Sequence, residues 1–376
     1  MKPVICHVLH TLNTGGAEVL ACEFGRQQRD AFEVIYVCLD EAGNMASVMQ
    51  QEGFKVTVLN RKPGFDYGLT KRLHKLFIEE KVAIVHAHQY APFFYSSASR
   101  GLLANKPAIL FTEHGRAFPD MRRPKRCLAN RFLLKRCDRV VAVGKQVKQA
   151  LIDFEEIPEN RIEVIYNGVA SERYSTPITT EQRVAVRHSL DTNPNAPVVI
   201  QVARLHPLKD HITAIQTFAK TVAQLPDAKL WIVGEGEEHD KIVQEIQRLA
   251  INHNVRLLGN RTDVEVLIHA ADAFILTSIS EGIPLTVIEA MFAGIPCVCS
   301  NVGGLPEIIE HQRNGLLAPA RDPEALSVLL TEVLANQNRA KLLGQAGKID
   351  AQLRFSDRAM QDAYRKVYHQ MLSKKR

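Results

Sequence analysis

Short apolar runs alternate with helical patterns along the whole chain, and the same plan occurs twice. Strands that alternate with helices form parallel sheets, because a parallel connection needs a crossover. The pattern therefore predicts an α/β protein with two doubly wound, Rossmann-like domains. In the first half the predicted strands are Val4–Leu9, Phe32–Cys38, Lys55–Leu59, Ile84–His86, Ala108–Thr112, Arg139–Val143 and Ile162–Ile165. In the second half they are Val198–Ala203, Ala228–Val233, Val255–Leu258, Ala273–Leu276 and Pro296–Cys299.

A polar, irregular stretch separates the two halves. Residues 171–197 contain Ser-Thr-Pro and Asn-Pro-Asn-Ala-Pro sequences, which are typical of turns and loops. We therefore expect domains at 1–170 and 198–355 joined by a linker, with a short helix inside the linker at 183–190. A final helical pattern covers Ser356–Leu372.

The composition excludes several classes of protein. With 376 residues, 46% hydrophobic and 23% charged, the chain has enough apolar material for two cores. No apolar run approaches the roughly 18 residues of a membrane span. Val4–Leu9 is interrupted by His7 and is read as a strand, not as part of a signal peptide. The seven scattered cysteines, an odd number, predict reduced thiols and a cytoplasmic protein.

The net charge of +6 is concentrated in one segment. Residues 116–139 hold nine basic residues and two acidic ones, a net +7, which leaves about −1 for the rest of the chain. Apolar residues are interleaved with the charges, as in helices that bind membrane surfaces. We expect peripheral contact with an anionic membrane through 116–139, and the alternative is a solvated helix face. Nucleic acid is not an expected partner, because no recognition module accompanies the charge.

The most informative stretch is Ser278–Met291, where an apolar strand runs through a polar loop into a helical pattern. Unpaired backbone N–H groups and the positive end of the helix dipole suit a phosphate. Glu281 and Glu289 would repel phosphate, so these carboxylates more plausibly accept hydrogen bonds from sugar hydroxyls. Together these features predict a pocket for a nucleotide-sugar.

Two more loops follow predicted strands. Gly15-Gly16 allows close backbone approach to a ligand, although a plain tight turn is the alternative. Arg204 and Lys209 share one loop at the carboxyl end of a strand, where open α/β sheets bind ligands. Two cations there can neutralise a diphosphate.

Three histidines are candidates for polar chemistry. His86 and His88 lie at strand spacing and face the same side, so a zinc pair is an alternative to a structural role. His114 follows a strand just before Gly115, which suits contact with a sugar hydroxyl or the reaction centre. The chain has no Asp-x-Asp motif, so we expect no metal and no cofactor.

In combination these segments resemble the retaining glycosyltransferases of family 4, which have the GT-B fold. The resemblance covers nearly the whole chain. The order and spacing of the last motifs are the most specific part. The matching segments are Gly15-Gly16, 112–115, 167–169, 203–209, 234–236, 258–263, 281–289, 302–307 and 314–317.

The resemblance implies two domains that face each other across a cleft, with the acceptor on the first and the donor mainly on the second. It also implies that helix 356–376 packs back on the first domain. The implied catalytic residues are His114, Arg204, Lys209 and Glu281. The implied donor-binding residues are Gly15, Gly16, Asn260, Arg261, Gly282, Ile283, Pro284, Leu285 and Glu289. Asp210 departs from the glycine that the family often has there, which puts the shape of this loop in doubt.

The expected activity is transfer of a hexose from a nucleotide diphosphate sugar to a glycan or lipid-linked acceptor, as in polysaccharide or glycolipid synthesis. UDP is the first choice of nucleotide and GDP the second. Because no second carboxylate is placed as a nucleophile, we expect front-face retention. The alternatives are another GT-B activity, such as a nucleotide-sugar epimerase or a phosphorylase, and a catalytically silent sugar-nucleotide-binding protein.

Overall fold

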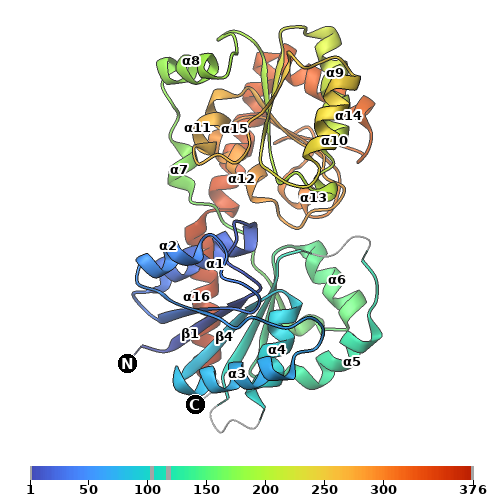
Figure 1. The fold of residues 1–376 in the computed structure, drawn as a ribbon. Helices are drawn as coiled ribbons and strands as arrows, with labels where there is room; N and C mark the ends of the chain where they lie inside the picture. Colours follow the sequence, from blue (N-terminus) through green and yellow to red (C-terminus); the bar gives the residue numbers. More distant parts are fainter. Residues whose placement is uncertain (1, 102–105, 116–119, 374–376) are drawn as a thin grey trace. The chain divides into compact units, whose positions relative to one another are not determined.

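The computed structural model describes residues 2–101, 106–115 and 120–373. The chain forms two units, Met1–Asn167 with Arg358–Arg376, and Gly168–Asp357 (Figure 1). Each unit is built on one parallel sheet flanked by helices, as the alternating pattern predicts.

The first unit holds a seven-stranded sheet of order β3-β2-β1-β4-β5-β6-β7. Its strands are β1 (Val4–Leu9), β2 (Glu33–Cys38), β3 (Lys55–Val58), β4 (Val82–His88), β5 (Ala108–Glu113), β6 (Arg139–Ala142) and β7 (Ile162–Val164). Its helices are α1 (Gly16–Gln28), α2 (Ala46–Gln51), α3 (Tyr67–Glu79), α4 (Tyr90–Arg100), α5 (Pro124–Leu133), α6 (Lys145–Glu155), the 3-10 turn η1 (Glu159–Arg161) and α16 (Asp357–Ser373). All the strands predicted in this half are present, with ends that differ from the prediction by at most two residues.

Helix α16 packs on the first unit although it is the last helix of the chain. Gln28 on α1 donates to the side chain of Gln361 at 2.9 Å. Tyr364 and Tyr368 are both about 1% exposed, and the Tyr368 hydroxyl lies 2.7 Å from His86 on β4. Helices α1 and α16 therefore cover one face of this sheet, the face to which His86 points.

The second unit holds a six-stranded sheet of order β10-β9-β8-β11-β12-β13. Its strands are β8 (Val198–Val202), β9 (Lys229–Val233), β10 (Val255–Leu257), β11 (Ala273–Leu276), β12 (Cys297–Ser300) and β13 (Leu316–Ala318). Its helices are α7 (Ser171–Ser175), α8 (Thr180–Ser189), η2 (Pro207–Lys209), α9 (His211–Gln224), α10 (His239–Arg248), α11 (Val264–Ala270), α12 (Leu285–Ala293), α13 (Leu305–Ile308), α14 (Pro323–Ala335) and α15 (Gln337–Arg354). The edge strand β13 was not predicted.

The core of the second unit lies between its sheet and the helices α9, α10 and α14. Ile215 and Phe218 on α9, Ile242 on α10 and Leu326 and Leu330 on α14 are all fully buried in one cluster. These positions recur at helical spacing, which is why the amphipathic pattern marked them as helices.

Residues 171–197, expected to form a linker, belong to the second unit. They contain α7 and α8, and α8 begins at Thr179 with a capping box that includes Gln182. The reason is a buried arginine. Arg187 is 2% exposed and binds the carboxylate of Asp272 at 2.8 Å, which holds α8 on the sheet.

The strand order reverses in each sheet beside its first strand, between β1 and β4 in one and between β8 and β11 in the other. Open α/β sheets bind ligands at such switch points, beyond the carboxyl ends of the strands. The loops after β1, β5, β8 and β11 are those that the sequence marks as candidates.

Candidate functional site

Lys209 and Glu281 form the centre of the candidate site in the second unit. Lys209 ends η2 after β8, and Glu281 lies in the loop after β11, at the switch point. The ammonium of Lys209 is 2.5 Å from Oε1 of Glu281, and the Ser278 hydroxyl donates to the same oxygen at 2.6 Å. The Glu281 side chain is only 7% exposed. A cation and a hydroxyl acceptor are thus held one hydrogen bond apart.

Asp210 gives the Lys209 loop its shape. Its φ is +46°, in the left-handed region that favours glycine and tolerates aspartate. Its carboxylate also caps α9, since it accepts from the Thr213 hydroxyl at 2.7 Å and the Thr213 N–H at 3.3 Å. The Thr277 hydroxyl donates to the Asp210 carbonyl at 2.8 Å. Aspartate can therefore stand where the family often has glycine, because its side chain caps α9. The hydrogen bond from Thr277 ties the loop to the end of β11.

Arg204 projects from a loop whose backbone is firmly held. The N–H of Leu205 donates to the Glu235 carbonyl at 2.9 Å. Gly234 and Gly236 have φ of +134° and +155°, and a Cβ on either would lie 2.1 and 2.4 Å from the carbonyl oxygens of residues 203 and 205. The guanidinium of Arg204 is exposed and has no partner among the described residues. A fixed backbone with a free guanidinium is suited to an incoming anion.

The loop Gly282–Leu285 leads into α12, whose first residue is Leu285. No side chain caps this helix, and its N-cap is Pro284. The loop is held from behind, because the Gly304 N–H donates to the Glu281 carbonyl at 3.1 Å, and a Cβ on Gly303 would lie 2.0 Å from the same oxygen. Without a side-chain cap, the first turn of α12 can present its N–H groups to a phosphate. Ile283, between these residues, is 4% exposed.

Glu289 lies on α12, one turn beyond its start, beside α7. Burial raises its pKa to about 7, while a hydrogen bond from the Tyr174 hydroxyl and the charge of Arg173 oppose that rise. Arg173 itself donates to Glu265 at 2.7 Å. Glu289 is therefore a hydroxyl acceptor whose charge changes near neutral pH. Tyr174 was not foreseen, because its segment reads as a polar linker.

Asn260 and Arg261 lie in the loop between β10 and α11. The Asn260 amide donates to Glu235 at 2.9 Å. Arg261 binds Asp263 in bidentate fashion, at 2.8 and 2.7 Å. Both side chains are engaged by acidic side chains, so a ligand at this place would meet mainly backbone atoms.

In the first unit, Gly15 and Gly16 lie after β1 and at the start of α1, again at the carboxyl edge of the sheet. Gly15 is in an extended conformation and no side chain caps α1. His114 directly follows β5 at the same edge. Its Nδ1 is buried and has no hydrogen-bond partner among the described residues.

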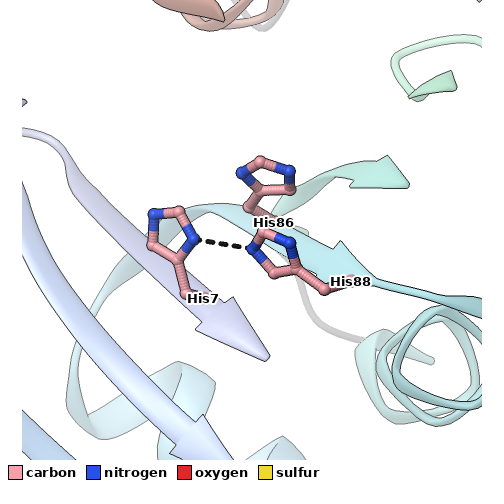
Figure 2. A group of neighbouring side chains, drawn as sticks. All are labelled: His7, His86 and His88. Carbon is pink, nitrogen blue, oxygen red and sulfur yellow. Dashed lines mark hydrogen bonds between the residues drawn. The ribbon is translucent and has the colours of Figure 1, made fainter. Parts of the chain in front are cut away.

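His7, His86 and His88 are the group with metal-ligand spacing in the described part of the chain (Figure 2). Two ligands of one tetrahedral zinc stand about 3.3 Å apart, whereas Nδ1 of His7 lies 2.9 Å from Nε2 of His88. His86 uses both nitrogens, to Tyr368 at 2.7 Å and to Thr112 at 2.8 Å. Hydrogen bonds thus satisfy His86 and join His7 to His88 without an ion. The expectation of no metal stays a prediction.

The basic segment is less positive in the fold than in the sequence. Residues 116–119 lie outside the described residues. From 120 to 139, Arg126 pairs with Glu155 at 3.1 Å, Arg131 with Glu156 at 2.9 Å, and Arg122 also pairs with Glu156. Two carboxylates from the end of α6 therefore offset part of the charge. In the described ranges no helix combines the length and the apolar character needed to cross a bilayer.

Two parallel α/β units, each with candidate loops at its switch-point edge, define a GT-B protein. Residues 14–173 match the family described as Glycosyltransferase Family 4, and residues 183–350 match Glycosyl transferases group 1. The chain belongs to these family 4 glycosyltransferases.

Three similar proteins illustrate the relationship. N-acetyl-alpha-D-glucosaminyl L-malate synthase of Bacillus anthracis is 23% identical over 96% of this chain and 95% of its own length. The UDP-Gal:alpha-D-GlcNAc-diphosphoundecaprenol alpha-1,3-galactosyltransferase of Escherichia coli is 28% identical, with 88% of each chain covered. The structure of Anabaena HepE in complex with UDP has a TM-score of 0.85 at 21% identity and covers 97% of this chain and 99% of its own.

Proposed function

We propose that this glycosyltransferase moves a hexose from a UDP-sugar to a glycan or lipid-linked acceptor, with retention of configuration and without a metal. The observation that carries the proposal is the 2.5 Å contact between Lys209 and Glu281 beside the start of α12. A hexosyl diphosphate places hexose hydroxyls and phosphate oxygens at similarly short separations. The Glu281 carboxylate and the Lys209 ammonium therefore match the hexose and the diphosphate of one donor. The UDP complex of the Anabaena structure and the UDP-Gal donor of the Escherichia coli relative support UDP over GDP.

In this proposal each group acts on charge that develops as the nucleotide departs. Arg204, Lys209 and the first turn of α12 stabilise the negative diphosphate, while the sugar gains oxocarbenium character. Glu281 accepts from hexose hydroxyls, Glu289 from ribose hydroxyls, and the backbone near Asn260 and Arg261 meets the base. The leaving phosphate accepts the proton of the acceptor hydroxyl on the front face of the sugar. A covalent glycosyl adduct on Glu281 in a trapped reaction would contradict this mechanism.

Calorimetry with UDP, GDP and ADP in EDTA tests the donor half of the proposal. We expect UDP to bind most tightly, and the chelator to leave binding unchanged. A requirement for a divalent ion would contradict the proposed metal independence. Incubation of UDP-sugars without acceptor separates the alternatives, since an epimerase interconverts the sugars and a silent protein binds them without any turnover.

Glu289 makes donor binding depend on pH in a predictable direction. The carboxylate form of Glu289 accepts hydrogen bonds from two hydroxyls, and its pKa in the free protein is about 7. Hydroxyls of the bound ligand should lower that pKa. Binding below pH 7 should therefore release a proton. We expect the affinity for UDP-glucose to fall about tenfold from pH 8 to pH 6. Calorimetry in buffers of different ionisation enthalpy measures the released proton. A sugar diphosphate is chosen because, as a diester, it has no titrating phosphate in this range.

Two variants make the Glu289 experiment specific. Glu289→Gln should remove the pH dependence. Tyr174→Phe should move the midpoint of the pH dependence to higher pH, because the hydrogen bond from Tyr174 lowers the pKa of Glu289 and its loss raises that pKa. Arg173 and Glu265 also face this carboxyl and are unchanged in both variants. A pH dependence that persists in Glu289→Gln assigns it to another group.

We further propose that the protein acts in the cytoplasm at the inner face of a membrane, docked through 120–139. Leu128 and Phe132, one turn apart on α5, are 58% and 68% exposed, and Met121 is 62% exposed. Lys125 on the same helix and Lys135 just beyond its end are exposed and have no side-chain partner among the described residues. Apolar residues flanked by unpaired cations suit an anionic bilayer surface, where each basic residue contributes about 1 kcal/mol.

Vesicle sedimentation tests the membrane proposal. We expect the double variant Lys125→Ala/Lys135→Ala to bind phosphatidylglycerol-containing vesicles about thirtyfold more weakly than wild type, which corresponds to about 2 kcal/mol. Phe132→Ser should weaken binding to the same vesicles by loss of apolar burial. Lys220→Ala, which removes an exposed lysine from α9, is the matched control. Equal binding to neutral phosphatidylcholine vesicles would argue against the charge-based docking.

A further inference from the structure

Three histidines form a continuous hydrogen-bonded row in the first unit. Nδ1 of His7 is 2.9 Å from Nε2 of His88, and Nδ1 of His88 is 2.9 Å from Nε2 of His114. The residues come from β1, from β4 and from the position after β5, three neighbouring strands in the sheet. The row therefore runs across the sheet and ends at the candidate residue His114; Figure 2 shows its first contact.

All three imidazoles are neutral near pH 7, because burial disfavours their charged forms. It lowers the pKa of His7 to about 3 and that of His114 to about 4, and holds the pKa of His88 well below its usual range. Among the described residues, the rings of Tyr36 and His86 lie against the row and that of Tyr364 lies against His86, and burial raises the pKa of both tyrosines. These described neighbours are all uncharged at neutral pH.

Counting protons leaves the row two arrangements. A neutral imidazole has one N–H and one bare nitrogen, so three rings carry three protons. Each of the two contacts needs one proton, and His88 can supply only one of them. The third proton is then on an outer nitrogen, either Nε2 of His7 or Nδ1 of His114. In the first case all three rings carry the proton on Nε2, and in the second all three carry it on Nδ1.

We propose that His7 and His88 are positioning residues that set the tautomer of His114. Nδ1 of His114 is buried without a partner among the described residues, so the row decides whether this atom offers a hydrogen bond or accepts one. A sugar hydroxyl can meet either form, and the choice selects the orientation of that hydroxyl. The contact of His114 with a sugar hydroxyl is the expectation from the sequence, and it rests on the proposed function. The coupling of the three tautomers does not.

Nitrogen-15 NMR of the full chain labelled with 15N-histidine tests the coupling directly. Protonated and bare imidazole nitrogens differ widely in chemical shift, so each tautomer is read from the spectrum. We expect His7, His88 and His114 to share one tautomer. Different tautomers within the row would overturn the proposal. Stoichiometric metal in the purified protein, with histidine signals that change in EDTA, would also overturn it, because a metal-bound nitrogen carries no proton.

Substitution at the far end of the row tests the transmission. His7→Phe keeps an aromatic ring against Phe24 and Tyr36, and we expect it to change the tautomer population of His114 two rings away. Tyr368→Phe is the matched control, because it removes a buried hydroxyl that contacts His86 and leaves the row intact. A His114 spectrum that His7→Phe leaves unchanged would overturn the coupling. If His7→Phe fails to fold, His7→Gln serves instead, and the wild-type measurement needs no variant.

Addition of UDP-glucose distinguishes the positioning role of the row from the proposed function of the protein. We expect it to shift the Nδ1 signal of His114, and we expect His7→Phe to weaken its binding by about tenfold, the value of one hydrogen bond. UDP-glucose that binds without any change at His114 would overturn the positioning role. Failure of both UDP and UDP-glucose to bind would instead contradict the proposed function, while a shared tautomer would still establish the row.

Discussion

Replacement of Lys209 or Arg204 by alanine is expected to lower the kcat of sugar transfer by roughly 10²- to 10³-fold, the usual cost of one preorganised group that stabilises developing charge. Lys209 has the greater expected effect. It is partly buried against Glu281 at 2.5 Å, so its removal also leaves that carboxylate without its counter-ion. Arg204 has no side-chain partner within the described part of the chain, and its variant should retain the geometry of the loop.

Single-turnover kinetics with a UDP-sugar, together with calorimetry of UDP, separate loss of binding from loss of chemistry. Because Lys209 and Glu281 touch, the effects of Lys209→Ala and Glu281→Gln should be far from additive in a double-mutant cycle. Lys220→Ala is the control, since Lys220 forms an exposed pair with Glu324 on the same unit. Full activity in Lys209→Ala would show that the diphosphate binds elsewhere.

Arg187→Leu is expected to lower the free energy of unfolding of the second unit by about 3 kcal/mol, because it removes a buried guanidinium that pairs with Asp272 and donates to several backbone carbonyls. The guanidinium also donates to the carbonyls of Ala270 at 2.9 and 2.8 Å, and of Pro194 and Ala196 at 2.8 Å. Leucine satisfies none of these acceptors.

Urea unfolding followed by tryptophan fluorescence measures the free energy of unfolding of the second unit. The chain has one tryptophan, Trp231, which is fully buried on β9. Arg183→Leu is the control. Arg183 binds the same Asp272, but its side chain is 30% exposed, so its loss should cost about 1 kcal/mol or less. Equal effects of the two substitutions would assign the stability to helix α8 as a whole and not to the buried guanidinium.

Most of the fold could be predicted because strands and helices leave local periods in the sequence. The strands Val4–Leu9 and Ala273–Leu276 have the predicted ends. The linker could not be predicted correctly, since its polar composition hides Arg187, which becomes buried only when Asp272 lies beside it. The partial offset of the charge on the basic segment could not be predicted for a similar reason, because Glu155 and Glu156 are distant in sequence from the arginines they pair with.

In the candidate site, the positions of the loops could be predicted from the sequence and the side-chain contacts could not. The loops with Gly15, Arg204, Lys209 and Gly282 each follow a predicted strand, and parallel strands must bring such loops to one edge of their sheet. Where a side chain points across that edge has no local signal. The hydrogen bond of Tyr174 to Glu289 and the histidine row depend on contacts between elements that are far apart in the chain.

The sequence by itself determined the α/β class, the two sheets, the family and the loops that carry charge, because each rests on local periodicity or on short motifs. Only the tertiary structure decided which atoms meet. It placed the Lys209 ammonium against Glu281, put Asp210 in the left-handed region as the cap of α9, and aligned His7, His88 and His114. Such contacts arise from the strand order and from burial, and neither of these is encoded in any one segment.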